Sequence, residues 1–195
     1  MVAVHSTMLP LGTVAPDFSL PDAVTGRLVS PDDFAGKPAF LVAFICNHCP
    51  FVVHVRESLT ALIKEFQPKG LAAVAVCSND VGKYPEDSPS QMAVVARKLG
   101  FTFPYLFDEK QTVARDYHAA CTPDFYVFDA ARRLIYRGRY DESRPGRPEP
   151  VTGAELRAAI EAALAGTGIP ETAQKASVGC NIKWKRGNEP PWFPA

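Results

Sequence analysis

The sequence lacks several features that would assign it at once to a particular class of protein. It contains no stretch of about 18 consecutive apolar residues, the length that a membrane-spanning helix requires. Lys plus Arg and Asp plus Glu both number 21, so no overall charge favours nucleic acid or an anionic membrane as a partner. The five cysteines are too few for a disulfide scaffold, and an odd number cannot pair completely.

The first residues of the sequence also show no pattern of a secretory signal. Residues 1–12 contain neither a basic segment nor an apolar run of about seven residues, so no secretory signal is expected and the expected location is cytoplasmic. In a reducing compartment, cysteines are more often catalytic or metal-binding than structural. With 195 residues, 47% of them hydrophobic, the chain is long enough for one compact domain. We expect that domain over residues 1–165, with a C-terminal tail, 166–195, packed on it.

Two continuous apolar runs, residues 39–45 and 71–76, indicate central strands of a sheet that is covered on both faces. Between them, apolar residues recur at helical spacing from 52 to 66, and Pro68 and Gly70 end the pattern. A strand, a helix and a strand of these lengths predict a βαβ unit with parallel strands.

The second half of the chain predicts antiparallel pairing, because residues 125–128 and 134–138 form a natural hairpin. From residue 166 onward the periodicity disappears, which predicts an irregular tail. The pattern therefore favours an α/β fold with a central mixed sheet. The other expected elements are a small hairpin at 18–20 and 27–29, a short helix between 30 and 36, a helix at 88–100, a strand at 105–107, a helix at 108–117 and a helix from 152 to 164.

The motif most suggestive of chemistry is Cys46-Asn47-His48-Cys49, where the first apolar run meets the long helix. Two cysteines separated by two residues beside a βαβ pattern are typical of a redox pair. Free backbone N–H groups and the dipole at the start of a helix stabilise a thiolate. Lowering a thiol pKa from ~8.5 to ~6.5 raises the thiolate fraction at neutral pH from roughly 3% to roughly three quarters. His48 is a candidate for tuning this charge.

Pro50 indicates which cysteine attacks. Proline is favoured at the first helical position, which makes Cys49 the N-cap residue. If Cys46 were the N-cap, Pro50 would remove the first hydrogen bond of the helix. We therefore predict that Cys49 is the attacking thiolate and that Cys46 is its disulfide partner.

The strand, the motif and the helix, together with residues 120–129 before a hairpin, resemble the thioredoxin superfamily. In particular they resemble its peroxiredoxin-like branch, the alkyl hydroperoxide reductase/thiol-specific antioxidant proteins. Residues 46–51 and 179–190 resemble a group of bacterial thioredoxin-like proteins described as redoxins or thiol-disulfide isomerases. The resemblance covers roughly residues 13–190. It implies a thioredoxin-like fold: a central mixed sheet flanked by helices, with an N-terminal hairpin and a C-terminal irregular tail.

The same resemblance implies roles for particular residues. Thr122 and Pro123 match the residue pair that ends in the family's cis-proline, so they are expected beside the redox cysteines, docking an extended substrate. Phe44 lies five positions before Cys49, as an aromatic residue precedes the first redox cysteine of thioredoxins. Val52 stands where those proteins have their second cysteine, and this is a departure from the pattern.

The sequence thus predicts an enzyme, a thiol-disulfide oxidoreductase that exchanges disulfides with protein or small thiol partners. An external dithiol would supply its reducing equivalents, and no separate cofactor is implied. The first alternative is a thiol peroxidase, in which Cys49 becomes a sulfenic acid that Cys46 or Cys180 resolves. With either cysteine in the peroxidatic register, the threonine hydroxyl of peroxiredoxins is missing, because Cys46 or Ala43 takes its place. Disulfide exchange is therefore favoured.

The second alternative is a metal-binding or metallochaperone-like protein without catalysis. Cys46, Cys49, His118 and Cys121 could form a tetrahedral zinc site. Strand alternation turns Cys121 away from the motif if Thr122 faces it, so this site is disfavoured and no metal ligand is assigned. Neither nucleic acid nor a membrane is an expected partner, and the oligomeric state stays open.

Other conspicuous residues have structural interpretations. His54 is expected to be solvated or to cap a helix, Cys77 to fill the core, and Cys121 to be structural. Trp184 and Trp192 are expected to anchor the tail on apolar surface. An arginine-rich hairpin is expected to be a solvated face; its arginines are at positions 132, 133, 137, 139, 144 and 147.

Overall fold

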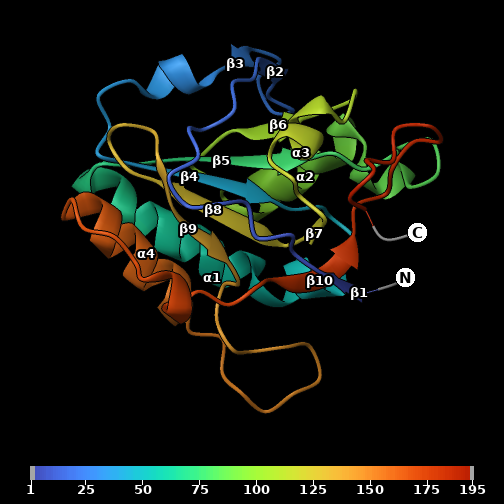
Figure 1. Ribbon diagram of the computed structural model, residues 1–195. Coiled ribbons are helices and arrows are strands. Elements are labelled where there is room, and N and C mark those ends of the chain that lie inside the picture. Colours follow the sequence, from blue (N-terminus) through green and yellow to red (C-terminus); the bar gives the residue numbers. More distant parts are fainter. Residues whose placement is uncertain (1–2, 194–195) are drawn as a thin grey trace.

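The computed structural model describes residues 3–193, and its centre is a five-stranded sheet (Figure 1). The order of the strands is β6-β5-β4-β8-β9. β4, β5 and β6 run parallel, whereas β8 is antiparallel to both β4 and β9. The bounds are β4 (Ala39–Phe44), β5 (Leu71–Cys77), β6 (Tyr105–Phe107), β8 (Asp124–Phe128) and β9 (Leu134–Gly138). The predicted mixed sheet, parallel in its first half and antiparallel in its second, is confirmed.

Helices and terminal segments cover the two faces of this sheet. The helices are α1 (Pro50–Phe66), α2 (Pro89–Leu99), α3 (Thr112–Asp116) and α4 (Ala154–Leu164). Leu41 and Ala43 of β4 belong to one buried cluster with α1, α2 and α4. Phe40 and Val42 point to the opposite face, into a cluster with α3 and with Trp184 of the C-terminal segment. All six residues of β4 are buried, which explains why the strand is apolar throughout. None of the helices in the described part of the chain is long and apolar enough to cross a membrane.

A second, smaller sheet joins the two ends of the chain. Its order is β1-β10-β7, with β1 at Ala3–His5, β10 at Val178–Asn181 and β7 at Cys121–Thr122. The prediction of a wholly irregular C-terminal tail was wrong at β10. This four-residue strand forms by backbone pairing to β1 and β7, so it leaves no periodic pattern in the sequence. The expected N-terminal hairpin is present as β2 (Leu20–Pro21) and β3 (Leu28–Val29).

Two helices are shorter at their N-terminal ends than the sequence predicted. α3 begins at Thr112 and not directly after Asp108, whose carboxylate accepts hydrogen bonds from the Ser78 hydroxyl and the Ala114 amide. α4 begins at Ala154, not at 152, because the two preceding amides donate to the distant carboxylate of Asp141. Asp108 therefore caps the first turn of α3 from outside the helix, and Asp141 does the same for the amides before α4.

The arginine-rich hairpin is not uniformly solvated, and the prediction was wrong for two of its residues. Arg137 is buried and contacts Gln174 and Glu171 of the C-terminal segment. Arg139 forms a bidentate ion pair with Glu155 of α4. These arginines fasten β9 and the chain that follows it to α4 and to the C-terminal segment.

Candidate active site

Cys49 lies at the point where β4 ends and α1 begins. It is the N-cap residue of α1, and Pro50 follows it at the start of the helix, which is the arrangement that the proline predicted. Its backbone is extended, with φ −66° and ψ 122°. The backbone N–H of Val52, one of the N–H groups that the first turn of a helix leaves free, helps to lower the pKa of this thiol.

Two further cysteines converge on the Cys49 sulfur. The thiols of Cys46 and Cys180 both donate hydrogen bonds to it, and the backbone N–H of Cys180 does so as well. The Cys46 hydrogen bond is the largest cause that lowers the pKa of Cys49, which is about 5 in spite of the opposing effect of burial. The pKa of Cys46 is raised well above the ordinary thiol value by the same hydrogen bond, by burial and by the charge of Asp87. Cys49 is therefore the thiolate, and Cys46 is a neutral thiol beside it.

The Thr122–Pro123 peptide bond is cis, and Thr122 contacts both cysteines of the motif. Its hydroxyl lies 3.4 Å from the sulfur of Cys46. Its carbonyl oxygen lies 3.2 Å from the sulfur of Cys49 and accepts a hydrogen bond from the Cys49 thiol when that thiol is protonated. Cys121 is fully buried and its sulfur lies near the carbonyl oxygen of Pro123, at 3.9 Å. Thr122, and not Cys121, is thus the residue of β7 that faces the motif.

One edge of β7 is already paired. The sequence predicted that an extended substrate would dock at Thr122 and Pro123, but the chain's own strand β10 pairs there, with Cys180 opposite Thr122. The sequence patterns did not reveal β10, and substrate docking at Thr122 and Pro123 stays a prediction. Cys180, which the sequence offered only as a candidate resolving cysteine, lies in direct contact with Cys49.

His48 is held by a buried carboxylate that the sequence analysis missed. Its Nδ1 lies 2.7 Å from Oδ2 of Asp87, and its ring stacks on Tyr84 with 5.2 Å between the centroids. Asp87 is fully buried and accepts hydrogen bonds from the backbone N–H of Asn47 and from the side-chain amide of Asn79. The hydrogen bond to Asp87 is the largest cause that raises the pKa of His48, and burial opposes it. Asp87 thus makes His48, between the two cysteines of the motif, easier to protonate.

The zinc site considered from the sequence is not assembled within residues 3–193. His118 lies elsewhere, with its ring stacked on Trp192 at 5.1 Å. A different trio, Cys46, His48 and Asp87, has its S, N and O atoms within 4.8 Å of one another. Since the carboxylate of this trio already pairs with His48 and accepts hydrogen bonds from Asn47 and Asn79, we interpret the trio as a polar network around Cys46.

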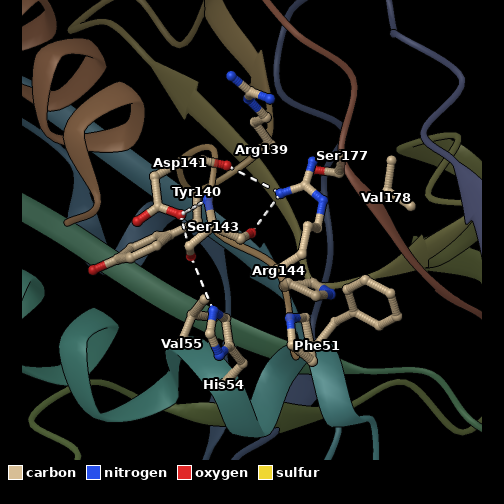
Figure 2. A pocket seen from close by; sticks show the side chains of 12 residues that line it. Phe51, His54, Val55, Arg139, Tyr140, Asp141, Ser143, Arg144, Ser177 and Val178 are labelled. Carbon is tan, nitrogen blue, oxygen red and sulfur yellow. Dashed lines mark hydrogen bonds between the residues drawn. The ribbon is translucent and has the colours of Figure 1, made fainter. Parts of the chain in front are cut away.

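A pocket lies beside the first turns of α1 (Figure 2). Phe51 and His54 of α1 line it, together with Pro123 and the segment after β9. His54, expected to be solvated or to cap a helix, lies with its Nε2 3.0 Å from the hydroxyl of Ser143, which donates to Asp141. The guanidinium of Arg144 donates to two main-chain carbonyl oxygens and forms another wall of the pocket. This hollow adjoins the cis-proline loop, since Pro123 is part of its lining.

The three converging sulfurs are shielded from solvent. Cys49 is 0% exposed, Cys46 2% and Cys180 4%. Asn47 and His48, between the two cysteines of the motif, and Phe51, just after Pro50, are only half-buried. The cysteines thus lie one layer beneath the surface at the start of α1.

Comparisons with known proteins agree with this geometry. Residues 11–137 match the model of the AhpC/TSA family. An uncharacterized conserved protein from Geobacillus kaustophilus is 52% identical over 95% of this chain and 97% of its own, with a TM-score of 0.92. A hypothetical protein from Sinorhizobium meliloti is 48% identical over 94% and 99%, with a TM-score of 0.91. A thiol:disulfide interchange protein from Chlorobium tepidum shares the fold at 18% identity, covering 80% and 99%, with a TM-score of 0.61. No curated protein matches the sequence.

Proposed function

The chain belongs to the AhpC/TSA family and is an oxidoreductase with a thioredoxin-like fold, and from this premise we propose that it is a thiol-disulfide oxidoreductase that uses the Cys46-Asn47-His48-Cys49 motif. The Cys49 thiolate attacks one sulfur of a substrate disulfide and releases the other sulfur as a thiolate. Cys46 then loses its proton and attacks the Cys49 sulfur of the mixed disulfide. The second substrate thiolate leaves and takes up a proton. The substrate gains two electrons, and the protein is left with a Cys46–Cys49 disulfide.

The observation that carries this proposal is the position of Cys49 at the N-terminus of α1, next to the Cys46 thiol. Hydrogen bonds from Cys46, Cys180 and two backbone N–H groups hold the pKa of Cys49 at about 5. Such a group is almost entirely thiolate at pH 7. A low pKa also makes this sulfur a good leaving group, so that an external dithiol can reduce the disulfide again.

The surrounding residues have supporting roles in the proposal. His48, whose pKa the neighbouring Asp87 raises, tunes the reactivity of the thiolate when it is protonated. The hydroxyl of Thr122 contacts Cys46, the sulfur that must move to close the disulfide. The partners are thiols and disulfides in the cytoplasm, and the chemistry requires no cofactor beyond the external dithiol.

Glutathione disulfide provides a direct test. At pH 7, we expect the reduced protein to form a Cys46–Cys49 disulfide that peptide mass spectrometry detects after acid quenching and alkylation. Cys49→Ser should abolish this reaction. Cys77→Ser, which changes another fully buried cysteine, should leave it intact. If the wild-type protein is oxidised no faster than the Cys49→Ser variant, the proposal is wrong.

A second candidate function is the reduction of peroxides, and the burial of Cys49 favours it because a peroxide is small. The thiolate would attack one peroxide oxygen, break the O–O bond and release water or an alcohol after protonation. The resulting sulfenic acid would then condense with a neighbouring thiol and release water. Hydrogen peroxide should in that case be consumed at a rate far above that of free cysteine. Dimedone should label Cys49 when Cys46 and Cys180 are both replaced by serine.

A further inference from the structure

β10 occupies the strand position that an extended substrate would take beside the cis-proline loop. It runs antiparallel to β7, with Cys180 opposite Thr122 and Asn181 opposite Cys121. The amide of Ile182 continues the pairing by donating to the carbonyl oxygen of Ala120, at 3.0 Å. Backbone pairing to an exposed strand edge is a general way in which proteins bind peptides. Here the paired segment belongs to the chain itself.

The approach of β10 to the cis-proline loop is very close. A Cβ atom at position 179 would clash with the carbonyl oxygen and carbonyl carbon of Thr122. Gly179 is therefore the residue that allows this contact, and any larger side chain would push the strands apart. The next residue along the strand is Cys180.

Cys180 has the relationship to Cys49 that a substrate cysteine would have. Its thiol and its backbone N–H both donate hydrogen bonds to the Cys49 sulfur. It approaches from β10, whereas Cys46 approaches from the loop before α1, so Cys49 has two thiols within hydrogen-bonding distance. Thr122 contacts both cysteines of the motif and pairs with Cys180 as well.

We propose that β10 is a built-in substrate strand and that Cys180 is an internal exchange partner of Cys49, an inference that rests on the proposed thiol-disulfide exchange. In the oxidised protein, the Cys180 thiol loses its proton and attacks the Cys49 sulfur. The Cys46–Cys49 bond breaks, the Cys49–Cys180 bond forms, and Cys46 leaves as a thiolate that takes up a proton. The number of disulfides does not change, so the step consumes no oxidant and no reductant.

The occupied edge also bears on the class of substrate. Hydrogen bonds hold the segment after β10: the Lys183 amide donates to Asn79 at 2.9 Å, and the Gln111 side chain donates to the Lys183 carbonyl oxygen at 2.9 Å. An extended polypeptide would have to displace this anchored segment to pair with β7. A low-molecular-weight disulfide needs no strand edge. We therefore infer that a small disulfide reacts with Cys49 more readily than an extended polypeptide, which would compete with β10 for β7.

Variants that lack Cys46 isolate the internal exchange. Cys46→Ser should react with glutathione disulfide at Cys49, and Cys180 should then displace glutathione to form a Cys49–Cys180 disulfide. The Cys46→Ser/Cys180→Ser double variant should stop at the glutathione adduct. The matched control is Cys46→Ser/Cys77→Ser, which also loses a second buried cysteine. Acid quenching and peptide mass spectrometry measure the lifetime of the adduct and identify any linked peptides.

We expect the adduct to disappear at least about tenfold faster in Cys46→Ser and in the Cys77 control than in the Cys180 double variant, because the exchange is intramolecular. An adduct that persists equally long in all three would overturn the inference while leaving the reactivity of Cys49 intact. Absence of any adduct at Cys49 would instead contradict the proposed function itself. The wild-type protein should also reduce glutathione disulfide faster than insulin, and comparable rates for both would contradict the preference for a small substrate.

Discussion

Replacement of Cys46 by alanine should raise the pKa of Cys49. The Cys46 thiol is the first cause of the low value, and alanine removes its hydrogen bond without adding another donor. The remaining donors, the Cys180 thiol and two backbone N–H groups, stay in place. The change therefore tests one hydrogen bond within the site, while the helix and its N-cap are unaltered.

The size of the effect follows from the energy of such a bond. A hydrogen bond to a charged acceptor contributes about 1.5–3 kcal/mol, and one pKa unit corresponds to about 1.4 kcal/mol. The pKa of Cys49 should thus rise from about 5 to about 6–7. At pH 5.5 the thiolate fraction should fall from roughly three quarters to roughly one quarter or less. Cys46→Ser retains a donor and should shift the pKa much less.

The assay is the rate of alkylation of reduced protein by iodoacetamide between pH 3.5 and 9, with mass spectrometry to follow Cys49. The inflection of the rate against pH gives its pKa. Cys77→Ala serves as the control because its thiol is fully buried and does not donate to Cys49. The reasoning is refuted if Cys46→Ala leaves the inflection at the wild-type pH, or if the serine variant moves it as far as alanine does.

Three further predictions follow from buried groups around the site. In urea titrations, Gly179→Ala should lower the free energy of unfolding by about 1–3 kcal/mol, because the added methyl group overpacks against β7. The control Gly168→Ala, where the added methyl group meets open space, should change it by less than about 0.5 kcal/mol. Equal effects of the two variants would contradict the close approach of β10. Burial raises the pKa of Asp124 to about 7, so the protonated form stabilises the fold at pH 4 and this contribution, up to about 4 kcal/mol, is lost as the pH rises to about 7. Asp124→Asn should flatten that pH dependence of unfolding, and an unchanged slope would be the contrary result. Asp87→Asn should lower the pKa of His48 in an NMR titration, and an unaltered pKa would show that the carboxylate does not hold the imidazolium.

The local features of the site could be predicted because they depend on neighbouring residues. The apolar residues of β4 indicate a strand buried on both faces, and Pro50 alone indicates that Cys49 caps the helix. The cis-proline loop was expected near the cysteines from the family resemblance, and Thr122 does contact both of them. These predictions needed only periodicity, helix-capping preferences and a short motif.

The features that sequence reasoning missed depend on contacts between distant parts of the chain. Asp87 lies in a short 3₁₀ helix about 40 residues after the motif, with no local pattern that links it to His48. β10 was missed because a four-residue strand that pairs through its backbone has no hydrophobic alternation to detect. Gly179 was a visible signal, since a glycine next to a cysteine can mark a close backbone approach. Its meaning became clear only once β7 was placed opposite it.

The most direct test of the account is to identify the first disulfide that forms when the reduced wild-type protein receives one equivalent of glutathione disulfide at pH 7. Samples quenched with acid over time, alkylated and mapped by peptide mass spectrometry should show Cys49 joined to Cys46, with Cys49–Cys180 appearing later by internal exchange. A Cys49 that stays alkylatable throughout, while other cysteines are oxidised, would contradict the claim that the sulfur at the start of α1 is the reactive thiolate.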